Sequence, residues 1–243
     1  MVSVFRNAVK SAVNLVLPTY CLGCGSQGDV LCSACATTLP RLEAPFCDIC
    51  SDPGIAGVCR PCRLQSRFSA ANLAGIRSPY LMEGTLRKAI HSFKYRNARV
   101  VADCLGTLLA DYFRDNSLPG NVLIPVPLHP ARLRQRGYNQ SELLARVVGK
   151  ASGLPVETGL LARALNAPPQ AGASDVNRRR TNTSGAFRCD TNASGLACVL
   201  VDDVCTTGST LGACAEALAE AGASSVLALT LAREKLEPRL PRA

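Results

Sequence analysis

The sequence predicts an α/β fold: a parallel sheet with flanking helices, preceded by a small N-terminal module rich in cysteine. Two observations predict it. Short apolar runs of strand length recur after residue 69, and stretches with apolar residues at helical spacing separate them. Before these runs, eight cysteines stand in four Cys-x-x-Cys pairs. We therefore expect two domains, residues 1–68 and residues 69–243.

Composition supports a folded domain with a real hydrophobic core. The chain has 243 residues, 47% of them hydrophobic, and because it contains no Trp, aliphatic side chains must form most of the core. No apolar run approaches the ~20 residues of a membrane-spanning helix. Residues 1–17 have helical spacing but no small-residue cleavage site, so we expect an N-terminal helix, no secretory signal and a cytoplasmic protein.

The basic excess favours a polyanionic ligand. Net charge is +9, and residues 77–146 hold eleven Lys or Arg against five acids. Such a surface suits pyrophosphate or nucleic acid, although an ordinary solvated surface would have the same charge. Only five Tyr and six Phe are available to stack on bases, which argues against a dedicated platform for single strands.

The Cys-x-x-Cys pairs predict two structural zinc sites. Each pair places two thiolates on one tight turn, and two pairs complete a tetrahedral Zn²⁺ site with no open position for chemistry. Short connecting loops favour pairing of neighbours along the chain, with crossed pairing as the alternative. Redox-active pairs and iron–sulfur ligation are the rival interpretations. The predicted ligands are Cys21, Cys24, Cys32, Cys35, Cys47, Cys50, Cys59 and Cys62.

Five other cysteines have no ligand spacing, and we expect them to be small buried apolar residues. They are Cys104, Cys189, Cys198, Cys205 and Cys214. The zinc module carries few basic residues, so direct DNA contact by this module alone is the less favoured interpretation.

The α/β domain begins with a strand and two helices. An apolar run at residues 73–76 predicts the strand, and apolar spacing predicts helices over residues 82–93 and 98–113. Lys94 follows the first helix, and two roles are open for it: a solvated side chain or a ligand contact.

A second strand, residues 121–126, leads into the turn Pro125-Val126-Pro127-Leu128. Prolines end strand pairing and fix a rigid turn. A basic segment with Arg132 and Arg136 follows, and then a helix over residues 141–150. Ligands of open α/β sheets bind beyond the carboxyl ends of the strands, so we expect this turn to line the site.

Residues 198–212 carry the clearest functional pattern. The apolar residues 198–201 predict a buried strand that ends at the acids Asp202 and Asp203. A turn of small hydroxylated residues, 206–210, precedes a helix from Leu211, and residues 226–231 predict the next strand.

This strand–turn–helix arrangement suits a sugar phosphate. Backbone N–H groups at a helix N-terminus lack intrahelical partners and attract anions, and Gly208 lets the backbone approach one closely. Paired carboxylates beside that turn suit the vicinal hydroxyls of a sugar. Solvated acids before an ordinary capped helix are the simpler alternative.

A long basic segment, residues 163–187, contains proline, glycine and three consecutive arginines. A loop of this length in a compact domain is usually functional or disordered. We interpret it as a flap that closes over an anionic substrate, with a disordered linker as the alternative.

The residues after Val201 resemble the phosphoribosyl pyrophosphate (PRPP) loop of type I phosphoribosyltransferases. Together with the cysteine pairs, Phe-Lys-Tyr, Pro-Val-Pro-Leu and Arg-x-x-x-Arg-Gly-Tyr-Asn-Gln, they resemble, in the same order, the ComF family. That family joins a double zinc ribbon to a phosphoribosyltransferase-like domain and is associated with DNA uptake in natural transformation. The resemblance covers nearly the whole chain, and Tyr138 stands where the family usually has Phe.

The resemblance implies roles for individual residues. The paired acids hold the ribose 2′- and 3′-hydroxyls, residues 206–210 hold the 5′-phosphate, and residues 126–128 correspond to the pyrophosphate loop. The implied catalytic residues are Asp202, Asp203, Arg132 and Arg136, and residues 137–140 line the site beside them. The implied PRPP-binding residues are Lys94, Val126, Pro127, Leu128, Val201, Asp202, Asp203, Val204, Cys205, Thr206, Thr207, Gly208, Ser209 and Thr210, with Gln170, Arg179 and Asn182 in the flap.

The implied function is binding of Mg²⁺–PRPP and transfer of its phosphoribosyl group with release of pyrophosphate, which makes the protein a transferase. Mg²⁺ is then held mainly by the oxygens of PRPP, and no protein nucleophile is required. The alternative is a catalytically silent sensor of PRPP or phosphate that binds single-stranded DNA in competence. Single-stranded DNA and DNA-uptake or helicase proteins are the candidate partners that the resemblance implies.

Overall fold

The computed structural model describes residues 19–64, 73–95, 98–163 and 186–235. The predicted N-terminal helix lies outside these ranges, and so do Gln170, Arg179 and Asn182 of the predicted flap. Among the described helices, none is long and apolar enough to cross a membrane.

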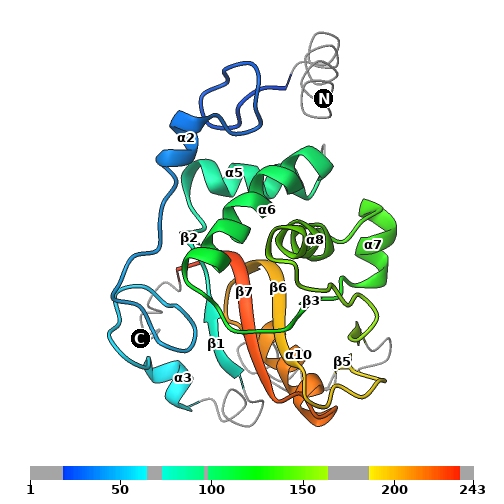
Figure 1. Cartoon of the computed structure of the whole chain (residues 1–243). Helices are drawn as coiled ribbons and strands as arrows, with labels where there is room; N and C mark the ends of the chain where they lie inside the picture. Colours follow the sequence, from blue (N-terminus) through cyan, green and yellow to red (C-terminus); the bar gives the residue numbers. More distant parts are fainter. Residues whose placement is uncertain (1–18, 65–72, 96–97, 164–185, 236–243) are drawn as a thin grey trace, which may run out of the picture.

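A parallel sheet forms the centre of the molecule, as the sequence predicts (Figure 1). Its strands stand in the order β1 (Leu73–Arg77), β7 (Ser225–Arg233), β6 (Ala197–Cys205) and β3 (Val122–Pro125), and the short β2 (Tyr80–Leu81) also pairs with β7. All of these pairs are parallel. β6 and β7 occupy the middle, where both faces are covered, and this explains their continuous apolar runs.

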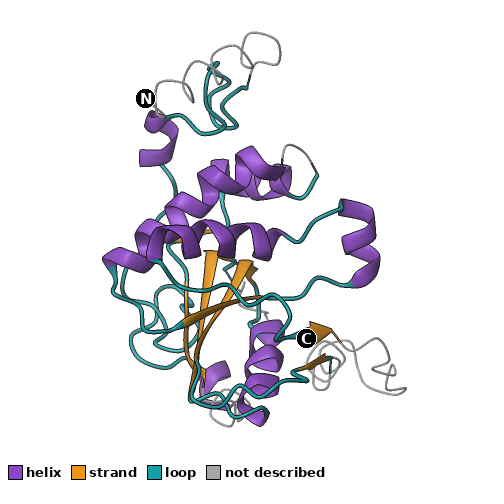
Figure 2. Cartoon of the chain, turned by 45° about the vertical axis from the view of Figure 1, so that its right-hand side comes forward, coloured by secondary structure: helices purple, strands orange, loops and turns teal. Residues whose placement is uncertain are grey.

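Helices cover both faces of the sheet (Figure 2). α5 (Gly84–Phe93), α6 (Ala98–Asp115) and α8 (Gln140–Ser152) lie on one face, and α10 (Ser209–Glu220) lies on the other. These four helices agree with the predicted ones to within a few residues at each end, because each has an apolar stripe of helical period.

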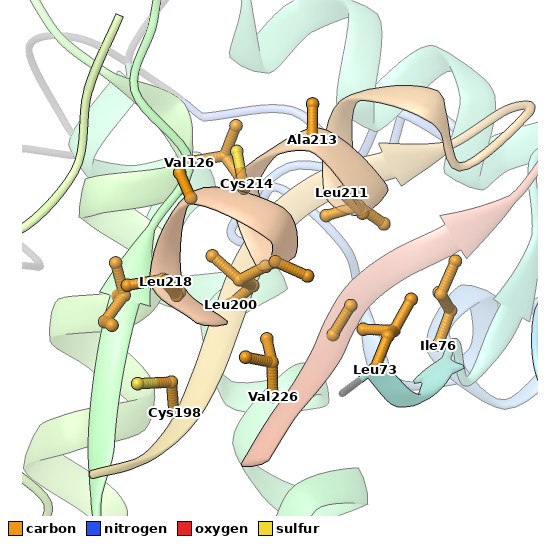
Figure 3. Packing of buried hydrophobic residues seen from close by; sticks show 14 of the residues in the cluster. Leu73, Ile76, Val126, Cys198, Leu200, Leu211, Ala213, Cys214, Leu218 and Val226 are labelled. Atoms are coloured by element: carbon orange, nitrogen blue, oxygen red, sulfur yellow. The ribbon is translucent and has the colours of Figure 1, made fainter. Parts of the chain in front are cut away.

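Alternate residues of the central strands enter different cores, because successive strand side chains point to opposite faces. Val199 and Leu229 pack with the helices of the first face. Leu200 and Val226 pack with Leu218 beneath α10 (Figure 3). The sheet is thus buried on both sides around β6 and β7.

The two cysteine-rich loops attach to different parts of the domain. Each contains one short helix, α2 (Ser33–Thr37) and α3 (Arg60–Leu64). The first loop shares a core with α5 and α6 through Val30 and Leu31. The second covers the outer edge of β1, where the N–H of Ile76 donates to the carbonyl oxygen of Ile49. This bond gives an open strand edge a backbone partner.

Strand β6 is longer than predicted. It continues through Asp202 and Asp203 to Cys205, because Asp202, Val204 and Cys205 keep their parallel pairing with β7. The expectation that the strand ends at residue 201 is therefore wrong. The two acids project from the last part of a strand rather than from a loop, which fixes their backbone.

The basic segment after β3 forms a helix that the sequence analysis missed, α7 (Pro130–Arg136). The N–H of Ala131 donates to His129 Nδ1 at its start, and Gly137, with φ +77°, ends it. None of its residues is buried. It therefore has no apolar periodicity to find, and only its capping residues indicate it.

The ends of the predicted flap also pair. β4 (Ala162–Arg163) and β5 (Phe187–Arg188) form a two-stranded antiparallel sheet that was not predicted. Two-residue strands are too short to show a period-two pattern in sequence.

Candidate functional site

The eight paired cysteines form two clusters with the geometry of zinc sites. Cys21, Cys24, Cys32 and Cys35 make one and Cys47, Cys50, Cys59 and Cys62 the other, with the Sγ atoms of each within 4.8 Å of one another. Ligands about 2.3 Å from a tetrahedral Zn²⁺ lie about 3.8 Å apart. Two Sγ–Sγ distances in the first cluster are 3.7 Å and one in the second is 3.8 Å. The residues therefore fit structural zinc, and pairing of neighbours along the chain is confirmed.

Backbone donors support the thiolates. The N–H groups of Gly23 and Cys32 point to Cys21 Sγ at 3.4 Å, and the N–H of Cys59 points to Cys47 Sγ at 3.3 Å. Such bonds orient metal ligands and favour their charged form. The two clusters differ in exposure, because all four cysteines of the second are buried whereas Cys24 of the first is exposed.

Residues 206–210, which we call the phosphate loop, connect β6 to α10. Gly208 has φ +73°, a left-handed conformation that suits glycine, and it stands directly before the first residue of α10. The hydroxyl of Thr207 donates to Ser209 Oγ at 2.9 Å and accepts from the N–H of Ser209. Thr206 and Thr207 are exposed. The helix N-terminus and the hydroxyls of Thr206 and Ser209 present donors to an anion.

The two acids have different environments. Asp202 Oδ1 accepts the hydroxyl of Ser141 at 2.7 Å and the N–H of Asp203 at 2.9 Å. Burial, and then the charge of Asp203, raise the pKa of Asp202 to about 7. Asp203 instead forms a salt bridge with Lys94, whose Nζ lies 3.2 Å from Oδ2. Lys94 is thus a contact of the acid pair and not a freely solvated side chain.

The turn after β3 lies beside the acids. The N–H of Val126 donates to the carbonyl oxygen of Val201, one residue before Asp202. Asn139 Nδ2 donates to the carbonyl oxygen of Val126, and its Oδ1 caps α8 by accepting the N–H of Ser141. One asparagine therefore fixes the turn and the start of the helix that carries Ser141.

The predicted arginines stand on α7, facing different neighbours. The Arg136 guanidinium lies 5.7 Å from the centre of the Tyr95 ring. Tyr95 directly follows Lys94 in the chain. Arg132 is exposed. Tyr138, the departure from the usual Phe, donates its hydroxyl to the carbonyl oxygen of Phe93 at 2.6 Å. That bond ties the segment after α7 to the end of α5.

Sequence reasoning missed two polar residues near the site, Ser141 and Arg163. Ser141 had a signal, because an Asn-x-Ser sequence is typical of a helix start. Arg163 stacks 5.2 Å from the centre of the Phe187 ring. Burial lowers the pKa of Arg163, and the nearby charge of Arg132 lowers it further. No local pattern in the sequence indicates that Arg163 feels the charge of Arg132.

The cysteines outside the clusters follow the prediction only in part. Cys198, Cys205 and Cys214 are buried, as expected. Cys104 and Cys189 are only partly buried, so the expectation is wrong for them. Cys189 lies beside β5, where its thiol donates to the carbonyl oxygen of Thr191.

Comparison with known proteins agrees with both parts of the structure. Residues 12–64 match the double zinc ribbon domain, and residues 151–243 match the phosphoribosyl transferase domain. The chain is 30% identical over 210 residues to competence protein ComFC of Bacillus subtilis, with 84% of each chain covered. It is 32% identical over 212 residues to DNA utilization protein YhgH of Salmonella typhi, covering 84% of this chain and 90% of that one.

A third relative covers less. Competence protein F of Haemophilus influenzae is 32% identical over 152 residues, which are 59% of this chain and 66% of that one. The ribbon match contains both cysteine clusters, and the transferase match contains the phosphate loop and the acid pair. With its double zinc ribbon, its phosphoribosyltransferase domain and these relatives, the chain belongs to the ComF family.

Proposed function

We propose that the protein binds Mg²⁺–PRPP at the carboxyl edge of β6 and β3 and transfers the phosphoribosyl group to an acceptor, releasing pyrophosphate. The observation that carries this proposal is the grouping of Asp202, Asp203 and Lys94 at the end of β6, the strand that leads into the phosphate loop. Carboxylates for sugar hydroxyls, a cation, and a helix N-terminus for phosphate are the parts that a sugar phosphate requires.

Each group has a proposed role. Asp202 and Asp203 accept hydrogen bonds from the ribose hydroxyls, and residues 206–210 donate to the 5′-phosphate. Lys94, Arg132, Arg136 and the turn at residues 126–128 neutralise and orient the pyrophosphate, and Gln170 and Arg179 contribute from the flap. The carboxylates are also the hard oxygen ligands that Mg²⁺ accepts, and Mg²⁺ supplies charge neutralisation at the pyrophosphate when bound.

The proposed reaction needs no nucleophile from the protein. The bond between ribose C1 and the pyrophosphate oxygen breaks as the bond from C1 to the acceptor forms, and the electron pair leaves with pyrophosphate. The protein contributes by positioning the reactants and by stabilising the charge of the leaving group.

Titration calorimetry of Mg²⁺–PRPP into the zinc-loaded protein tests the site. We expect saturable binding that the D202N/D203N variant loses. The matched control is D111N/D115N, which removes the same charge from exposed acids at the far end of α6. Absence of binding by the unaltered protein, or equal binding by D202N/D203N, would overturn the proposal. Pyrophosphate release with nucleobases and amines as acceptors then tests transfer.

The second candidate function is binding of single-stranded DNA, with or without transferase activity. The names of the relatives refer to competence and to DNA utilization. A surface pocket along α5 is also basic and carries the exposed ring of Tyr95, a combination that suits a nucleic-acid strand. It is lined by Gly84, Arg87, Lys88, His91, Ser92 and Tyr95.

Filter binding of oligodeoxynucleotides across a salt series tests this function. We expect affinity to fall steeply with salt, because neutralised phosphates release counterions. R87A/K88A should lower the salt slope by about two, one for each lost phosphate contact. Affinity that ignores salt and strand length would contradict DNA binding.

A further inference from the structure

Arg233, the last residue of β7, connects the second cysteine cluster to the phosphate loop. Its side chain is 1% exposed. Nη1 donates to the carbonyl oxygen of Cys205 at 3.2 Å and to Cys205 Sγ at 3.3 Å. Nη2 donates to Asp52 Oδ1 at 3.5 Å and to Cys50 Sγ at 3.8 Å. One guanidinium therefore contacts a zinc ligand, its neighbouring acid, and the residue that directly precedes the phosphate loop.

The two ends of this connection are firmly placed. Cys205 pairs with Arg233 in the β6–β7 ladder, and its carbonyl oxygen also accepts the N–H of Glu234. On the other side, Ser51, between Cys50 and Asp52, is buried and donates its hydroxyl to the carbonyl oxygen of Ile76 at 2.6 Å. The guanidinium thus bridges the end of β6 and a loop anchored to the edge of β1.

A buried guanidinium persists only where anions and acceptors are held around it. Four thiolates around one divalent ion keep a net negative charge, which complements Arg233 together with Asp52. The metal also fixes the turn that carries Cys50 and Asp52, because it links that turn to the opposite pair of cysteines. Loss of the metal lets Cys50 and Asp52, the anionic partners of Arg233, move. The hydrogen bonds from Nη1 to Cys205 then weaken.

We infer that Arg233 is a positioning residue through which the second cysteine cluster holds the phosphate loop in its ligand-binding conformation. Loss of metal from this cluster then loosens the end of β6 and the start of α10. The expected effect on PRPP binding rests on the proposed function. The coupling between the second cysteine cluster and the phosphate loop does not rest on it. The first cluster packs instead beside α5, where Gly23 approaches Thr85.

Hydrogen exchange followed by mass spectrometry tests the coupling in the full chain. The readout is the peptide spanning residues 202–212, which contains the Gly212 N–H bonded to the carbonyl oxygen of Gly208. The C59S/C62S variant removes the second metal without altering atoms that Arg233 contacts, and C21S/C24S removes the first metal as the matched control. R233K keeps the charge, but a single ammonium cannot bridge both partners.

We expect exchange of this peptide to rise about tenfold in C59S/C62S and R233K and less than about twofold in C21S/C24S. Peptides of α6 and α8 report whether a variant has unfolded generally. If C59S/C62S does unfold, R233K with two bound zinc ions decides the question. Unchanged exchange of residues 202–212 in R233K, or an equal rise in α6 and α8, overturns the inference.

Mg²⁺–PRPP titration of the same variants separates the two proposals. We expect R233K to bind about tenfold more weakly than the unaltered protein, because part of the binding energy must order the loop. Failure of the unaltered protein to bind removes the proposed function but leaves the exchange result standing. Equal affinity of R233K and the unaltered protein overturns the effect on binding.

Discussion

Lys94 gives the acid pair a counter-charge before any ligand arrives, through its salt bridge with Asp203. Their side chains are 27% and 15% exposed, and the ion pair lies at the edge of the site rather than deep within it. Ion pairs with access to water contribute little net stability. A ligand that brings a sugar and a pyrophosphate can therefore replace this pair with new partners for both residues at small cost.

Replacing Lys94 should weaken PRPP binding more than it weakens the fold. We expect K94A to lower the affinity for Mg²⁺–PRPP about tenfold, the effect of losing one charge-assisted contact of roughly 1.5 kcal/mol. Calorimetry measures the affinity, and K88A, at an exposed lysine of α5, the helix that ends just before Lys94, is the control. If K94A and K88A bind equally well, Lys94 only neutralises Asp203.

Asp202 makes stability depend on pH with an unusual sign. Its pKa of about 7 lies above the ordinary value of 3.8, so between these values the folded protein binds more protons than the unfolded chain. The free energy of unfolding should therefore fall as pH rises toward 7, by at most about 1.4 kcal/mol per pH unit. Above pH 7 this contribution stays lost.

Urea denaturation between pH 5.5 and 8 measures this dependence. We expect the slope with pH to disappear in D202N, because the amide oxygen still accepts the Ser141 hydroxyl but carries no charge. D115N, at an exposed salt bridge, should keep the slope of the unaltered protein. A slope that survives in D202N would assign the titration to another group.

Among single residues, the sequence predicts those site residues that stand close together in the chain and form a recognisable pattern. The acids and the phosphate loop are contiguous, and their residue types alone indicate a sugar phosphate. The partner of Lys94 and the bond from Ser141 are contacts between distant segments, so no spacing in the chain encodes them. The assignment of the acid pair and the phosphate loop to PRPP stays a prediction.

Among the elements, the packing of α6 against α8 depends on a close contact between Gly106 and Val147. A Cβ atom placed on Gly106 of α6 would lie 2.6 Å from Val147 Cβ of α8, well inside contact distance. A larger residue there must push the helices apart or force an unfavourable rotamer. Since α8 carries Ser141, this packing also bears on the acid pair.

We expect G106V to lower the free energy of unfolding by roughly 1–3 kcal/mol, the usual cost of overpacking. Denaturant unfolding measures it. G159A is the control, because a Cβ atom at residue 159 meets no atom within 4 Å and its backbone is not left-handed. Equal stability of G106V and G159A would mean that the two helices can separate freely.

Element prediction from sequence succeeded where an apolar face exists. α5, α6, α8 and α10 have such a face and were predicted, whereas α7 lies on the surface and was not. The end of β6 was misplaced for a related reason. Asp202 and Asp203 break the apolar run, yet pairing with β7 is a backbone property that polar side chains do not interrupt.

In the whole molecule, the second cysteine cluster is part of the core of the phosphoribosyltransferase domain. Cys47, Cys50, Cys59 and Cys62 belong to the same buried cluster as Leu200 and Val226 of the sheet. The sequence predicts the zinc ligands but not this attachment, because Arg233 and Asp52 are separated by 181 residues. We therefore propose the division into residues 1–68 and 69–243 as a division of the sequence. The hydrophobic core crosses this boundary, because the second cysteine cluster packs with the sheet.

The different burial of the two clusters predicts two rates of metal loss. Cys24 is exposed in the first cluster, whereas the second cluster has no exposed ligand. A chelator reaches the first metal directly but needs local opening of the core to reach the second. We expect two zinc ions per chain, released to a colorimetric chelator in a fast and a slow phase of equal amplitude.

Variants assign the phases. C21S/C24S should lose the fast phase and C59S/C62S the slow one, and loss of the slow-phase metal should lower the thermal midpoint of the α/β domain more than loss of the fast-phase metal. The physical reason is that the binding energy of a structural metal is folding energy, and all four ligands of the second metal are buried in the core of the α/β domain. A single phase, or a slow phase that survives in C59S/C62S, would mean that the burial of the second cluster does not control access to its metal.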